Sequence, residues 1–180
     1  MVPELPIAPP FWVFKFFFKQ QQGFLALPIF WATHTIIATS QGIQTLFIPI
    51  NKNSLAKNWQ PAHDLWIDYW LKTLKAAYGK APFFEFFHAE FRDTLIRNKR
   101  GYLNEINSAV FNIYCNWLGL SCPDRPIKWI RKASEQKNDI AYQLPTYYQI
   151  NPVPNEMQKN LGIIDVLMNV GKDARLWLFD

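Results

Sequence analysis

The sequence predicts an α+β domain that is dominated by helices and has a small sheet containing a β-hairpin near residues 33–50. Three observations lead to this prediction. Apolar residues recur every three or four positions from residue 66 to residue 117, which is the spacing of amphipathic helices. Two β-prone runs separated by a glycine-containing turn precede them. With 49% hydrophobic residues among 180, the chain can bury the core of one domain.

The N-terminal stretch is apolar but too broken to cross a membrane. Four prolines within residues 1–10 predict an extended arm, after which a single domain spans residues 11–180. Two lysines and Pro28 interrupt the aromatic stretch that follows. Neither part reaches the roughly 18–20 apolar residues of a membrane helix, and no signal-peptide pattern is present. We therefore expect no transmembrane segment and a cytoplasmic location.

The hairpin is expected from two short runs around residues 39–42. Gly42 can supply the positive φ that such a turn needs. In the second run, alternation puts three apolar residues on one face of the strand, namely Leu46, Ile48 and Ile50.

Three helices should follow the hairpin. The first spans residues 66–78 and stops at Gly79, and the second begins at Pro82, whose fixed φ suits a helix start. The third covers residues 103–117 and ends before Gly119. We expect the three to pack as consecutive antiparallel neighbours against the hairpin.

The last third of the chain has mixed signals. Residues 125–137 are interpreted as a short helix, residues 141–154 as an irregular segment and residues 160–170 as a final helix. Cys115 and Cys122 have neither zinc nor redox spacing and are expected to be reduced thiols.

Three segments, in this order, resemble the WbqC-like family of bacterial O-antigen and related surface-polysaccharide gene clusters. The first is HTIIATSQGIQTLFIPI, from His34 to Ile50. The second runs from Trp66 to Glu85 and contains Tyr78, Pro82 and Phe84 at matching places. The third is Tyr147-Tyr148-Gln149 followed by NLGIIDVLMNVG, from Asn160 to Gly171.

This resemblance implies a role in surface-polysaccharide biosynthesis, through transfer of an acyl or aminoacyl group to an amino sugar carried on a nucleotide. The implied partner is a nucleotide sugar or another small anionic sugar, and the implied reaction class is a transferase. The chain departs from the family pattern at two places. It has His34-Thr35 where the pattern has Arg-Asn, and Trp70 where many members have histidine. A non-catalytic binding or assembly module of the same fold is the alternative.

Two residues are candidates for catalysis, although the sequence alone does not identify the catalytic residue. His34 lies on a predicted strand at the position of the family's arginine, and histidine is the usual proton carrier near neutrality; a core or edge-strand histidine is the alternative. Asp165 interrupts an apolar helix and shares a face with Asn169. The family has an aspartate there as well, and a solvated helix face is the other interpretation.

Candidate substrate-binding residues fall into two groups. The first comprises Tyr147, Tyr148 and Gln149 with Asn169, because aromatic faces and amides suit sugar rings; packed tyrosines are the alternative. The second comprises Lys128 and Arg131, which together with Arg125 and Lys132 recur at helical spacing and could face a diphosphate. A solvated face is the alternative for this group.

The remaining patterns argue against other chemistries. His63 precedes Asp64, a potential helix N-cap, and His88 is one turn from Glu85. The histidines and cysteines show no metal-site spacing, so neither metal nor cofactor is expected. A net charge of +5 without a nucleic-acid-binding motif argues against a nucleic-acid partner. The sequence does not indicate an oligomeric state.

Overall fold

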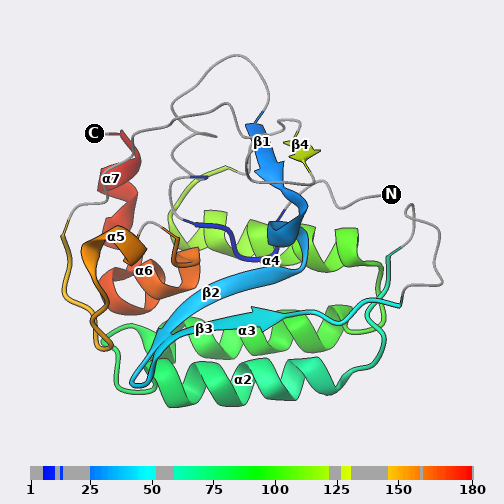
Figure 1. The fold of residues 1–180 in the computed structure, drawn as a ribbon, viewed down its shortest axis with the longest axis horizontal. Coiled ribbons are helices and arrows are strands. Elements are labelled where there is room, and N and C mark those ends of the chain that lie inside the picture. Colours follow the sequence, from blue (N-terminus) through cyan, green and yellow to red (C-terminus); the bar gives the residue numbers. More distant parts are fainter. Residues whose placement is uncertain are drawn as a thin grey trace.

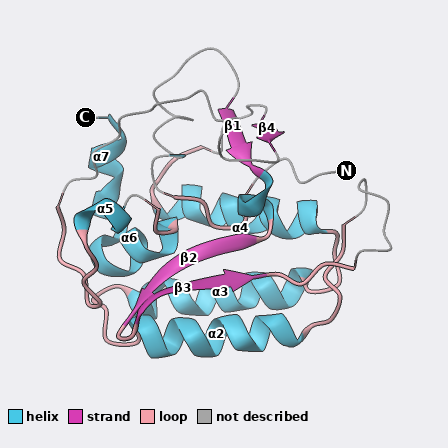
Figure 2. Cartoon of the chain, viewed as in Figure 1, coloured by secondary structure: helices cyan, strands magenta, loops and turns pink. Residues whose placement is uncertain are grey.

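The computed structural model describes residues 6–10, 13, 25–51, 59–121, 127–130, 146–158 and 160–179. It is a helix-dominated α+β fold that contains the predicted hairpin (Figures 1 and 2). The elements follow in the order β1 (Leu25–Pro28), η1 (Ile29–Ala32), β2 (His34–Thr39), β3 (Gly42–Phe47), α2 (Leu65–Tyr78), α3 (Phe84–Asn98), α4 (Leu103–Trp117), β4 (Ile127–Ile130), α5 (Asn155–Gln158), α6 (Ile163–Val170), η3 (Gly171–Arg175) and α7 (Leu176–Phe179).

The hairpin forms as predicted from β2 and β3, which pair antiparallel with His34 opposite Phe47 and Thr39 opposite Gly42. Gly42 has φ +110, a backbone conformation that glycine adopts without strain. The alternation of the sequence is kept after the strand, because Leu46 and Ile48 are both buried.

Helices α2, α3 and α4 form a layer against which the hairpin lies (Figure 1). Neighbouring helices are consecutive in the chain, as predicted, and β2 packs on α2. The aromatic spacing supplies the core, and its largest fully buried side chains include Trp70, Tyr78, Tyr114, Phe84, Phe91 and Phe111. The second helix begins at Phe84, two residues later than predicted at Pro82, because residues 81–83 form a turn whose Phe83 N–H donates to Met168 O.

Helix α6 is buried almost all round, as its apolar sequence requires. Gly162, just before it, donates its N–H to Ile36 O at the outer edge of β2. Residues 6–10 are all buried and pair with the rest of the fold through their backbone. Ile7 N–H donates to Trp31 O, Ile163 N–H donates to Pro9 O, and Pro10 forms a bridge with Gly162.

Residues 127–130 form the strand β4, so the prediction of a helix over residues 125–137 is wrong at these four positions. β4 pairs parallel with β1, with Ile127 opposite Leu25 and Ile130 opposite Pro28. The run Ile-Lys-Trp-Ile is β-prone, and its partner strand lies about a hundred positions earlier in the chain. The remainder of residues 125–137 lies outside the described part.

None of the helices in the described part of the chain combines the length and the apolar character that a bilayer crossing needs. Within the same residues, no group of three histidine, cysteine or acidic side chains is placed to hold a metal ion.

Candidate functional site

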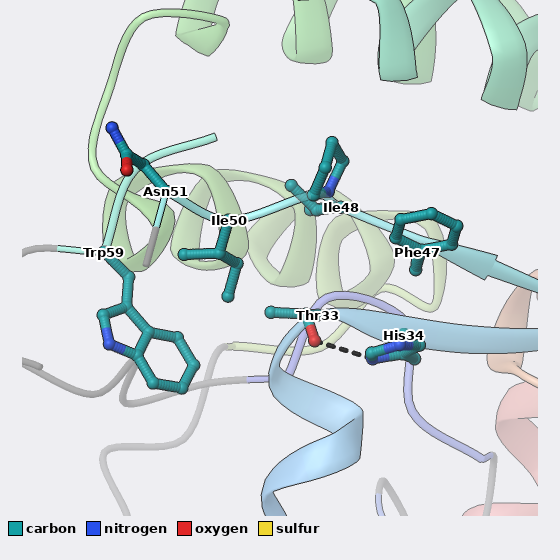
Figure 3. A pocket seen from close by; sticks show the side chains of 8 residues that line it. Thr33, His34, Phe47, Ile48, Ile50, Asn51 and Trp59 are labelled. Carbon is teal, nitrogen blue, oxygen red and sulfur yellow. Dashed lines mark hydrogen bonds between the residues drawn. The ribbon is translucent and has the colours of Figure 1, made fainter. Parts of the chain in front are cut away.

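A pocket of about 550 Å³ opens at the start of β2 and the end of β3 (Figure 3). We call it the His34 pocket, and it is lined by Thr33, His34, Phe47, Ile48, Pro49, Ile50, Asn51 and Trp59. Figure 3 shows Trp59 and Ile50 on one side, His34 and Phe47 on the other, and Thr33 between them. The volume lies within the range of small-molecule sites, and the mixture of apolar walls with a few polar groups is typical of such sites.

The imidazole of His34 is held between two phenylalanine rings. It stacks on Phe30 with ring centroids 4.3 Å apart and on its cross-strand partner Phe47 at 5.9 Å. Because the ring is half-buried, the pKa of His34 is lowered below its usual 6.5. The side chain is therefore neutral near pH 7.

Two contacts of Nδ1 bear on which ring nitrogen of His34 carries the proton. Nδ1 lies 3.1 Å from Phe30 O and 2.7 Å from Thr33 Oγ1. Since a backbone carbonyl only accepts, the bond to Phe30 O is made by the tautomer with its proton on Nδ1, and in this tautomer Thr33 Oγ1 is a second acceptor of the same proton. Nε2 then keeps a lone pair, which is the acceptor that a general base needs.

The walls of the His34 pocket are held by backbone pairing. Ile48 N–H donates to Thr33 O, which continues the hairpin past the strand ends. On the other side, Asn51 N–H donates to Gln60 O, while Leu103 N–H at the start of α4 donates to Trp59 O. The pocket is therefore attached both to the sheet and to the helical layer.

Trp70, at the position where many family members have histidine, lies in the core and not in the pocket. It is fully buried, and its Nε1–H donates to Phe47 O at 3.0 Å. This bond satisfies a carbonyl at the outer edge of β3. Thr35, the second residue of the divergent hairpin pair, is also buried and donates to Ala8 O at 2.7 Å. Of the three divergent positions, His34 is the one that lines the pocket.

A separate polar cluster surrounds Asp165, whose carboxylate is fully buried and accepts three hydrogen bonds. Tyr78 Oη–H donates to Oδ1 at 2.8 Å. Tyr147 Oη–H and Gln149 Nε2–H donate to Oδ2 at 2.5 and 2.8 Å. The cluster joins the end of α2, the irregular segment at residues 146–150 and α6.

Asn169 and Gln158 extend this cluster. Asn169 Nδ2–H donates to Asp165 O, and its Oδ1 accepts from Ile150 N–H. Gln158 Nε2–H donates to Gln149 Oε1 at 3.1 Å. Asn169 thus ties the irregular segment to α6, and Gln158 ties it to α5.

Burial controls the protonation of this cluster. The pKa of Asp165 is raised above its usual 3.8 because burial penalises the charge, although the three donors act in the opposite direction. Burial, and then the nearby Asp165 charge, raise the pKa of Tyr78 and of Tyr147 well above 10.0. Both tyrosines are therefore protonated donors at any physiological pH.

The structure brings some of the predicted site residues together and separates others. Tyr147, Gln149, Asp165 and Asn169 meet in the buried cluster, whereas Tyr148 is 78% exposed. His34 and the cluster lie towards opposite ends of β2, since Ala38 N–H donates to Tyr78 Oη. Four residues along a strand correspond to about 13 Å. The two catalytic candidates therefore belong to two different places.

Lys128 lies on β4, where its Cα is opposite Ala26, and not on the helix that its spacing suggested. Arg131 lies outside the described residues, as do Arg125 and Lys132. The expectation that these cations contact a diphosphate stays a prediction.

The other two histidines lie outside both places. Asp64 precedes α2 but makes no capping hydrogen bond with its side chain; it pairs instead with Lys99 Nζ at 3.6 Å. His63 lies beside it at the surface. His88 stacks on Phe84 with centroids 4.5 Å apart, and burial lowers its pKa.

The sequence did not single out most of the residues that line the His34 pocket. Trp59 and Asn51 flank a polar loop, where an isolated tryptophan is a weak signal. Phe47 falls on the face of its strand opposite to Leu46 and Ile48, and it is 50% exposed. Besides His34, the one sequence signal for this pocket was Phe47 itself, a large aromatic residue on the solvent face of an edge strand.

A protein-family model described as the WbqC-like protein family matches residues 29–144. No curated protein and no solved structure shows a significant match to the chain. The matched range contains the hairpin, the helical layer and every residue that lines the His34 pocket. Since the match spans more than half of the 180 residues, the chain belongs to the WbqC-like protein family.

Proposed function

We propose that this chain transfers an acyl or aminoacyl group to the amine of a nucleotide-linked amino sugar, as a step in bacterial surface-polysaccharide biosynthesis. The reaction takes place in the His34 pocket. The single observation that carries the proposal is the neutral, stacked imidazole of His34, held through Nδ1 at a pocket of about 550 Å³. The family resemblance supports the biological setting, and such substrates suit the cytoplasm.

In this reaction, His34 acts as the base. The sugar amine attacks the carbonyl carbon of an activated acyl donor, and its extra proton passes to His34 Nε2. A C–N bond forms, the bond from the carbonyl carbon to the leaving group breaks, and the proton moves on to the leaving group. The bond from Nδ1 to Phe30 O selects the tautomer in which Nε2 carries the lone pair, and burial keeps the imidazole neutral before each turnover.

The other pocket residues suit the sugar. The rings of Trp59 and Phe47 offer faces against which the C–H side of a sugar ring stacks. Asn51 brings an amide and Thr33 a hydroxyl. None of the eight described lining residues is charged. The diphosphate must therefore contact residues beyond these, and we propose Lys128 and Arg131 for that role.

The proposal is tested by incubating the chain with a nucleotide-linked amino sugar and an acyl donor and recording the product mass. His34→Asn keeps a donor near Phe30 O and removes the lone pair of Nε2. It should lower the rate by about 100-fold or more. His88→Asn is the matched control, because His88 is also half-buried and stacked on a phenylalanine, and it should retain the rate. Equal rates for both variants would show that His34 is not the base.

The biological setting has its own test. Deleting the gene should change the acyl substitution of the surface polysaccharide, as recorded by mass spectrometry. An unchanged composition would contradict the assignment to this pathway class.

A non-catalytic sugar-binding module is the second candidate. It is favoured by the burial of Thr35 and Trp70. Of the three positions that differ from the family pattern, only His34 then places a polar side chain in the pocket. Thermal unfolding with added nucleotide sugars separates the two functions. A raised Tm without any product supports binding alone, whereas product formation supports the transferase.

A further inference from the structure

A second, apolar hollow adjoins the His34 pocket. It has a volume of about 320 Å³ and is formed by the end of β3 and the first turns of α2. We call it the Leu65 hollow, and it is lined by Phe47, Pro49, His63, Leu65, Trp66 and Tyr69. Phe47 and Pro49 line both places, so they form the shared wall.

The lining of the Leu65 hollow suits an apolar guest. Leu65 is 71% exposed and Tyr69 and Phe47 are about half exposed, so three large side chains expose apolar surface to solvent here. Adjoining apolar side chains that remain exposed often mark a ligand site. The hydroxyl of Tyr69 is already engaged, because it accepts from Gln44 Nε2 at 2.7 Å. The hollow therefore offers an apolar surface with few polar groups.

Two hydrogen bonds hold its walls in place. Trp70 Nε1–H donates to Phe47 O, and the Gln44–Tyr69 bond joins β3 to the adjacent residue of α2. Trp66 closes the floor with an edge-to-face contact to Trp70 at 5.6 Å. The walls of the hollow are thus joined to each other by contacts between β3 and α2.

We propose that the Leu65 hollow holds the apolar body of the acyl group that is transferred in the His34 pocket, and that the donor is an acyl thioester with a chain longer than acetyl. This inference rests on the proposed function. The ring of His34 lies 5.9 Å from that of Phe47, so a carbonyl carbon placed near His34 has its chain directed over the shared wall. The amine nitrogen bonds to this carbon, the C–S bond breaks, and the thiolate leaves with the proton taken up by His34.

The test uses a series of acyl thioesters of N-acetylcysteamine, from acetyl to octanoyl, and measures both affinity and transfer. Affinity for the chain should rise by about four-fold per methylene until the hollow is filled. Leu65→Asp puts a carboxylate into the hollow at an exposed first helical position, which a helix N-terminus tolerates. It should abolish the rise in affinity with chain length. Phe86→Asp, at an equally exposed site in the first turn of α3, should keep the rise.

The outcomes separate the two proposals. An affinity that does not depend on chain length, or one that rises equally in Leu65→Asp, overturns the acyl site. A rise that Leu65→Asp abolishes supports it. The transfer assay tests the proposed function independently. Acetyl transfer without selectivity for chain length would contradict the acyl site in the Leu65 hollow but would support the transferase function. An affinity that rises with chain length, without any transfer, would support the acyl site but would contradict the transferase function.

Discussion

Replacing Asp165 with alanine should lower the free energy of unfolding by about 3–5 kcal/mol. The carboxylate is fully buried and accepts from Tyr78, Tyr147 and Gln149. Each buried donor that loses its acceptor costs about 1–3 kcal/mol. The three costs do not add fully, because donors in one cluster can partly rearrange. The expected loss is a large share of the roughly 5–15 kcal/mol that holds a domain of this kind folded.

Asparagine at position 165 should cost less, about 1–2 kcal/mol. Its carbonyl oxygen can occupy the place of Oδ2 and accept from Tyr147 and Gln149. Its NH₂ then faces the hydroxyl oxygen of Tyr78, which can accept. The proton of Tyr78 is the one group left without its acceptor.

Urea unfolding followed by circular dichroism measures all three proteins, and the slope should be unchanged if each unfolds in one step. An alanine variant within about 1 kcal/mol of the parent would refute the reasoning, because it would mean that the three donors find other acceptors. Equal losses for alanine and asparagine would also contradict it.

The difference in stability between the parent and Asp165→Asn should depend on pH, and the pKa shift of Asp165 gives the sign of this dependence. Because the pKa of Asp165 is raised above 3.8 in the fold, the folded state binds its proton more tightly than the unfolded state. The resulting stabilisation is complete below the usual pKa and is lost as the pH rises through the raised one. The stability of the parent relative to Asp165→Asn should therefore be greater at about pH 4 than at about pH 8. The opposite trend would contradict a raised pKa.

Three further predictions concern other parts of the molecule. If His34 is the base, kcat/KM for acyl transfer should fall on the acid side with an inflection below pH 6.5, because burial lowers the pKa of this imidazole. Gly162→Ala should lower stability by about 1–3 kcal/mol, measured by thermal unfolding, because a Cβ there would overlap Thr35 Oγ1. Trp70→Phe should cost about 2 kcal/mol, measured in urea, because Phe47 O loses its donor.

Each of these has a matched control. In a Thr35→Ala background, Gly162→Ala should cost less, and an equal loss in both backgrounds would exclude the overlap as the cause. Trp66→Phe removes an indole N–H that has no partner among the described residues. It should cost less than Trp70→Phe, and the reverse order would exclude the bond to Phe47. An unshifted acid inflection in His88→Asn is the control for His34.

The helices were predictable because their signals are local. Residues 66–78 and 103–117 repeat apolar side chains at three and four positions, and Gly79 and Gly119 follow their ends. These boundaries agree with α2 and α4 to within one residue. The hairpin was predictable for the same reason, since Gly42 and the alternation after it lie within a few residues of each other.

The strands β1 and β4 were not predictable, because each has four residues and its partner is about a hundred positions away. The spacing of cations around Lys128 suggested a helix, but backbone pairing determined the structure. The surroundings of Asp165 were visible only in part. Apolar residues on every side of this aspartate indicate burial, and a buried carboxylate requires donors. Nothing local identifies Tyr78 as one of them.

Of the residues that line the His34 pocket, the sequence predicted a functional role only for His34. The resemblance singled out position 34, whereas Trp59 and Asn51 reach the pocket through backbone pairing with residues on both sides of a loop. Such pairing depends on where the two ends of the loop meet in space, and the residue types near the loop do not predict that position.

The pairing of residues 9 and 10 with residues 162 and 163 affects how the chain folds during synthesis. Helices α2 to α4 can form early because their contacts are local, but the outer edge of β2 waits for Gly162, which is synthesised more than a hundred residues after Ile36. An open strand edge beside an incomplete apolar core is prone to aggregate. The nascent chain should therefore depend on chaperones until α6 has been synthesised and can cover the open edge of β2.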